Sequence, residues 1–166
     1  QNGVFNITEI AAMQGTTNLV TQATVTSSAA LSASTLAQIK DGSTSTHIEI
    51  GGPGEVWVQV DLGGFYRADS ISASGRTNWA DRLNGATIYS STQDMSGMTT
   101  AELTLAVAAA KVRSSLISGV TDSVLTYTVI QPNAADNDTW NAGANTITVT
   151  QVVQSATVTA TKTVTL

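Results

Sequence analysis

Strict alternation of apolar and polar residues is the feature that most constrains the fold of this chain. It is clearest in three stretches, EVWVQVDLG at 55–63, NTITVTQVV at 145–153 and TVTATKTVTL at 157–166. Successive side chains of a β-strand point to opposite faces of the sheet, so a period of two predicts strands that bury one face. In the first stretch this face consists of Val56, Val58, Val60 and Leu62. Turn signals containing glycine separate the alternating stretches, and the pattern predicts an antiparallel all-β sandwich.

The segment 99–116 fits both a helix and a strand. Thr99 and Glu102 have the spacing of a helix capping box, and the alanines that follow favour a helix. Alternate positions are also apolar, as in a strand, at Leu103, Leu105 and Val107. We interpret the segment as a strand that enters a loop, with a short helix as the alternative.

Composition argues against several classes of protein. The 166 residues suffice for one domain with a core, and 42% hydrophobic with only 11% charged residues argues against disorder. The net charge of -5 argues against a nucleic-acid partner, which requires a basic surface. No apolar run is long enough to span a membrane.

Cysteine is absent, so the sequence offers neither a disulfide framework nor a thiolate metal site. The chain begins at Gln1 and has no signal-peptide pattern, which is typical of a processed secreted or surface protein. We therefore expect an extracellular, cell-surface or virion-surface location.

One short loop, RTNWADR at 76–82, contains two arginines, an asparagine, a tryptophan and an aspartate, in a chain that is otherwise rich in Thr, Ser, Ala and Val. Arginine donors bind sugar hydroxyls, and a tryptophan ring stacks on the apolar face of a pyranose, so the loop predicts a sugar site. The candidate ligand-binding residues in the loop are Arg76, Asn78, Trp79, Asp81 and Arg82. His47, which follows the turn at 41–46, is a further candidate. The alternative is structural: the arginines pair with Asp81 and Asp69, and Trp79 plugs the core beneath the loop.

Four motifs occur in order along the chain: NLVTQATVTSSA at 18–29, AQIKDGSTST at 37–46, WVQVDLG at 57–63 and RTNWADRLNGATIYSS at 76–91. Together they resemble the discoidin-type, galactose-binding-like β-sandwich superfamily, which includes carbohydrate-binding modules and fucose-binding F-type lectins. The resemblance implies a jelly-roll-like β-sandwich at 18–155. Residues 1–17 and 156–166 fall outside it, and we expect a strand-like extension at each end.

The last motif is most similar to the F-type lectins, which use one histidine and two arginines in their sugar site. The resemblance implies that His47, Arg76 and Arg82 have these roles here. The chain departs from the family pattern in three ways: Asn78 replaces an aspartate, Arg82 comes one residue early, and the paired cysteines are missing. These departures leave the identity of the sugar open.

In many members of the superfamily an Asp-Gly-x-x-x-Thr turn wraps a calcium ion. The resemblance implies calcium ligands at Asp41, Ser43 and Thr46, whose oxygens suit a hard cation. A glutamate from the last strand usually completes such a site, and Gln151 stands there in this chain. The alternative is a plain turn in which Asp41 accepts hydrogen bonds from backbone amides.

No carboxylate pair or nucleophile–base pair stands out, so we expect that the protein is not an enzyme. We expect a carbohydrate-binding, lectin-like module with glycan partners. The alternative is a structural subunit of a phage capsid, tail or fibre, or of a surface filament. The tail at 156–166 favours a homo-oligomer, because a lone strand must pair with the N-terminal segment at 3–10 or with a neighbouring copy.

Overall fold

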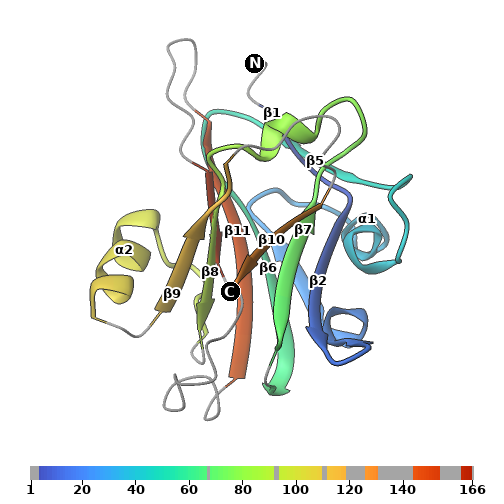
Figure 1. The fold of residues 1–166 in the computed structure, drawn as a ribbon. Helices are drawn as coiled ribbons and strands as arrows, with labels where there is room; N and C mark the ends of the chain where they lie inside the picture. Colours follow the sequence, from blue (N-terminus) through green and yellow to red (C-terminus); the bar gives the residue numbers. More distant parts are fainter. Residues whose placement is uncertain are drawn as a thin grey trace.

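The computed structural model describes residues 4–66, 68–91, 94–109, 112–118, 126–130, 144–153 and 162–165, and in the last three ranges it describes the backbone alone. Strands make up most of the regular structure in these residues, so the all-β prediction is confirmed. Figure 1 shows the strands in the middle of the molecule, with the helices α1 (Ala33–Leu36) and α2 (Thr100–Ala108) on opposite sides. Three 3-10 helices complete the described elements: η1 (Leu19–Gln22), η2 (Ala37–Lys40) and η3 (Ala80–Leu83).

The larger sheet has six strands, in the order β4 (Thr24–Ser27), β6 (Gly54–Phe65), β11 (Ala144–Val153), β12 (Lys162–Thr165), β8 (Thr87–Ser91) and β9 (Val112–Leu116). The long strand β6 pairs antiparallel with β4 on one side and with β11 on the other. β12 lies between β11 and β8, antiparallel to β11 and parallel to β8.

Two smaller sheets accompany the larger one. The four-stranded sheet has the order β10 (Thr126–Ile130), β7 (Ser70–Ser74), β2 (Glu9–Gln14) and β3 (Thr17–Asn18). The two-stranded sheet pairs β1 (Val4–Ile7) antiparallel with β5 (Ile48–Gly51). All described pairings in these two sheets are antiparallel.

One apolar core joins the three sheets. The predicted inner face of β6 is confirmed, because Val56, Val58, Val60 and Leu62 are all buried. The same cluster contains apolar residues of both smaller sheets, namely Phe5, Ile7, Ile10, Ala12, Ile48, Ile50, Ile71 and Ala73. Burial of a large aliphatic side chain stabilises a fold by about 1.5–3 kcal/mol, so this shared cluster is the main force that holds the sheets together.

The opposite face of the larger sheet is partly covered as well. On β8, Ile88 belongs to the main core, whereas its neighbour Tyr89 belongs to a second cluster with Met95, Leu103 and Val112. On β6, the side chain of Gln59 is also buried, and its amide donates to Asp94 and Ser96 at 3.2 and 2.9 Å. Helix α2 and the segment before it therefore cap this outer face.

The interpretation of 99–116 as a strand entering a loop is wrong for residues 100–108, which form α2. The capping box is present: the Thr99 hydroxyl accepts from the Glu102 amide, and the Glu102 carboxylate accepts from the Thr99 amide at 2.7 Å. Leu103 is buried while Leu105 is 71% exposed, so these residues do not share one face as they would on a strand. A strand, β9, follows the helix.

Both expected terminal extensions belong to the fold. Residues 4–14 supply β1 and β2, and their side chains Phe5, Ile7 and Ile10 lie in the core. In the tail, residues 162–165 form β12 inside the larger sheet. The expected pairing with the N-terminal segment is therefore wrong for residues 162–165, and pairing with another copy stays a prediction. Residues 156–161 and Leu166 lie outside the described part.

None of the described helices is both long and apolar enough to cross a membrane.

Candidate functional site

The predicted binding loop connects β7 to β8; its helix η3 lies near β1, and Arg76 lies beside Glu49 of β5. Two hydrogen bonds fix its start, because the backbone amide and the hydroxyl of Thr8 both donate to the Ser74 carbonyl oxygen, at 2.9 and 3.0 Å. At Gly75 the loop folds back so closely that an added Cβ would lie 2.6 Å from the Cα of Ala80. Only glycine fits this position without a shift of the backbone.

Trp79 stands at the tip of the loop, and its side chain is held although it is 45% exposed. The preceding residue, Asn78, has a φ of 66°, a left-handed conformation that asparagine adopts more readily than most residues. The Trp79 amide donates to the Arg76 carbonyl oxygen at 2.9 Å. The Arg82 guanidinium carbon lies 4.0 Å from the centre of the indole ring, a cation–π contact. The exposure argues against a core plug.

Arg82 connects this ring to a buried residue of β1. Assigned from its hydrogen-bonding neighbours, the amide of Asn6 directs its oxygen to Arg82 Nη1, at 2.7 Å, and its nitrogen to Glu49 Oε2, at 3.1 Å. Asn6 is fully buried, so these partners satisfy both ends of an amide that is removed from water. One buried amide therefore holds a guanidinium from the loop and a carboxylate from β5.

Arg76 reaches the same carboxylate from the other end of the loop. Its Nη1 lies 3.8 Å from Glu49 Oε2, and the two side chains are 41% and 49% exposed. His47 is close enough to sense this pair: burial and the Arg76 charge lower the pKa of the imidazole, and Glu49 acts in the opposite direction. The neutral imidazole is therefore the favoured form near pH 7.

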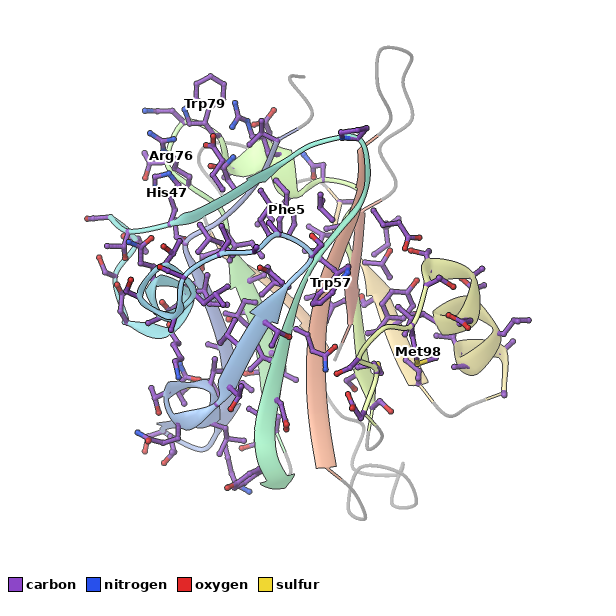
Figure 2. The ribbon with its side chains drawn as sticks, turned by 180° about the vertical axis from the view of Figure 1, so that it is seen from behind. Phe5, His47, Trp57, Arg76, Trp79 and Met98 are labelled. Carbon is purple, nitrogen blue, oxygen red and sulfur yellow. The ribbon has the colours of Figure 1, made fainter. Side chains whose placement is uncertain are left out.

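The predicted loop residues and His47 come together at one end of the molecule. Figure 2 shows Trp79, Arg76 and His47 one after another along that end of the molecule, with Trp79 outermost. Asn78 is exposed in the turn before Trp79, and Asp81 is half-buried in η3. Arg76 pairs with Glu49 and not with Asp69, its expected alternative partner. The Asp69 carboxylate accepts from the Gly15 amide at 2.7 Å.

Sequence reasoning missed two residues of this site, Asn6 and Glu49. Each is a polar residue between two apolar ones, in the stretches FNI and IEI. The alternation marks Glu49 as an outward-facing residue of β5, but it gives no sign that β5 lies beside the loop. Asn6 carries a stronger signal, because a polar residue in an apolar stretch requires buried partners.

The predicted calcium turn is closed by its own hydrogen bonds. Asp41 Oδ1 accepts from the Ser43 amide at 2.8 Å, and Oδ2 accepts from the Thr46 hydroxyl at 2.7 Å. This is the geometry of the alternative, a plain Asp-Gly turn. Within the described residues, no group of three or more His, Cys, Asp or Glu side chains is arranged to hold a metal ion. The calcium site stays a prediction from resemblance, and the Gln151 side chain lies outside the described part.

A second carboxylate, Glu9 of β2, approaches this turn. Its Oε2 accepts from the Gly42 amide at 3.2 Å. The pKa of Glu9 is raised from 4.5 to about 7: burial raises it most, the hydrogen bond from Gly42 lowers it, and the nearby Asp41 charge raises it. The turn is therefore joined to β2 by a carboxylate whose ionisation is disfavoured in the folded state.

The chain finds no match among protein-family models, curated proteins or solved structures. The residues gathered around Trp79 are therefore the basis for a functional proposal.

Proposed function

We propose that the protein binds glycans through a surface formed by His47, Glu49, Arg76, Trp79 and Arg82, named here the Trp79 surface. We also propose that its sheets form a jelly-roll-like, galactose-binding-like sandwich in which this surface is built by the loops at one end. The protein acts as a non-catalytic, lectin-like module in an extracellular, cell-surface or virion-surface setting.

The observation that carries the proposal is the half-exposed indole ring of Trp79 against the Arg82 guanidinium. An exposed tryptophan side chain loses conformational freedom when a ligand orders it, and this loss weakens binding. Here Arg82 and the turn hydrogen bonds order the ring beforehand. A held aromatic surface suits the apolar C–H face of a pyranose, which stacks on it without further rearrangement.

Polar groups beside the ring supply the remaining contacts that a sugar requires. Arg76 and Glu49 are half-exposed, and His47 is partly exposed. Arginine donates only, a carboxylate accepts only, and a neutral imidazole does one at each nitrogen. Hydroxyl groups both donate and accept, so this mixture of donors and acceptors matches a sugar better than it matches an ion of one sign.

A structural role in an assembly is the second candidate. It is favoured by two large apolar side chains, Leu105 on α2 and Leu116 on β9, which are 71% and 55% exposed. Measurement of the mass of the full chain by light scattering separates a monomer from an assembly. A Leu105→Lys, Leu116→Lys double variant reduces that mass if these side chains form the subunit contact.

The proposal is tested by retention of the full chain on a glycan array. We expect a defined subset of glycans to be bound, and we expect Trp79→Ala to lose this binding while its melting temperature stays within a few degrees. Leu105→Ala is the matched control, since it also removes an exposed apolar side chain but lies on α2. Retention that Trp79→Ala leaves unchanged contradicts the proposed site.

A further inference from the structure

We infer that the ligand of the Trp79 surface is a neutral sugar with two adjacent free hydroxyl groups, which Glu49 and Arg76 bind as a pair. The inference rests on the proposed function and adds to it the class of sugar and the role of Glu49. It follows from the way in which the charges of the surface are already paired.

Glu49 and Arg76 present an acceptor beside a donor. Their closest atoms are 3.8 Å apart, longer than a good hydrogen bond, and about half of each side chain is exposed. The carboxylate can therefore accept further hydrogen bonds, and the guanidinium can donate them. One sugar hydroxyl donates to the carboxylate while its neighbour accepts from the guanidinium, and hydrogen bonds to charged groups are the stronger ones.

The same arrangement disfavours an acidic sugar. The carboxylate of a sialic or uronic acid would face Glu49, and like charges brought together weaken binding. Arg82 is also poorly placed to bind the carboxylate of an acidic sugar. Its Nη1 already donates to buried Asn6 and its face lies against Trp79. Arg82 is thus engaged before a ligand arrives, and Arg76 lies beside the Glu49 carboxylate.

Asn6 is the positioning residue of this pair. It touches no solvent, yet its amide nitrogen holds Glu49 Oε2 and its amide oxygen holds Arg82 Nη1. Asparagine supplies a donor and an acceptor on the same carbon atom, whereas aspartate supplies acceptors alone. Asn6→Asp therefore keeps the contact with Arg82 but repels the Glu49 carboxylate.

The experiment compares neutral with acidic probes on the full chain. Immobilised galactose, fucose, mannose and glucose are the neutral probes, and sialic acid and glucuronic acid are the acidic ones. We expect retention on one or more neutral probes only, and loss of that retention when either of two adjacent hydroxyls is methylated. Glu49→Gln, which keeps size and removes charge, should weaken binding about tenfold or more. Glu102→Gln on α2 is the control.

Preference for the acidic probes, or Glu49→Gln binding as tightly as the wild type, overturns the inference. If Trp79→Ala still abolishes retention in that case, the proposed function survives and only the sugar class is wrong. Retention of none of the neutral or acidic probes, and of no glycan on the array, overturns both.

The role of Asn6 is tested by rescue, because a substitution at this fully buried residue affects folding as well as binding. We expect the single variant to lower the melting temperature and to bind at least tenfold more weakly. Adding Glu49→Gln lets an amide donate to the new carboxylate, so the double variant should regain melting temperature that Asn6→Asp loses. A double variant no more stable than Asn6→Asp shows that the two residues are not coupled, and overturns the positioning role.

Discussion

Arg82 and Arg76 look equivalent in the sequence, but the structure gives them different surroundings. Arg82 satisfies the buried Asn6 carbonyl group and stacks on Trp79, whereas Arg76 forms a half-exposed ion pair with Glu49. Sequence alone predicts both as ligand-binding residues. It cannot distinguish their roles, because the role of Arg82 depends on the buried Asn6, which is more than 70 residues away in the chain.

We predict that the two arginines differ in their effect on stability. Arg82→Ala should lower the free energy of unfolding by about 1–3 kcal/mol, because the buried Asn6 oxygen loses its donor. Arg76→Ala should lower it by about 0–1 kcal/mol, as for other exposed ion pairs. Urea unfolding measures both values, and both variants should lose glycan binding. Equal losses of stability would mean that Arg82 does not anchor the loop to β1.

Gly75 is the residue that allows the loop to fold back. We predict that Gly75→Ala destabilises the protein by about 1–3 kcal/mol, because the added Cβ overlaps the backbone of Ala80 and the loop must shift. The matched control is Gly51→Ala, whose Cβ would meet only the Val4 side chain at 3.8 Å. Thermal unfolding of the two variants should show a drop for Gly75→Ala alone. A similar melting temperature for both variants would show that the loop accommodates a Cβ at position 75 without strain.

At the scale of elements, the sequence predicts β6 correctly and the interpretation of 100–108 as a strand is wrong. The alternation in 55–63 determines one buried face, and the main core lies on that face as expected. In 99–116 two local signals competed. The capping box formed, and the helix buries Leu103 with Ala106 and Val107 against its cluster, a spacing of three and four residues. Leu105 has no such role, so its apolar character made the strand interpretation misleading.

The contact between β2 and the 41–46 turn should make stability depend on pH. Because the pKa of Glu9 rises from 4.5 to about 7 on folding, the folded chain binds more protons than the unfolded chain between these values. The free energy of unfolding contributed by Glu9 therefore falls as pH rises from about 4.5 to about 7. Glu9→Gln can still accept from Gly42 and has no charge. We predict that it is more stable than the wild type at pH 8, with the advantage shrinking toward pH 4.5.

Melting temperatures at pH 5 and pH 8 measure this effect. Glu102→Gln is a control of opposite sign, because hydrogen bonds from the Thr99 amide and hydroxyl lower the pKa of Glu102. Its variant should lose stability relative to the wild type at high pH, and the difference should disappear as pH falls. A constant difference between Glu9→Gln and the wild type across the range would show that Glu9 titrates normally.

At the scale of the whole molecule, the sequence predicts which residues are strands better than it predicts which strands are neighbours. Alternation predicts a strand in the C-terminal stretch, and residues 162–165 form the strand β12. Nothing local indicates that β12 enters between β11 and β8, or that β1 carries a core phenylalanine and a site asparagine together. Such pairings depend on contacts between distant parts of the chain, which a period of two does not encode.

The central claim is that Trp79 contacts a bound sugar, and the signals of the tryptophan indole N–H groups test it most directly. The chain has three tryptophans, so a ¹⁵N–¹H correlation spectrum contains three such signals, and Trp79→Phe assigns the relevant one. Trp57, on β6, is the internal control, and Trp140 lies outside the described residues. On titration with a glycan retained on the array, we predict that the Trp79 signal shifts with ligand concentration while the Trp57 signal stays in place. Saturable binding that moves the Trp57 signal and leaves the Trp79 signal unchanged would contradict the account.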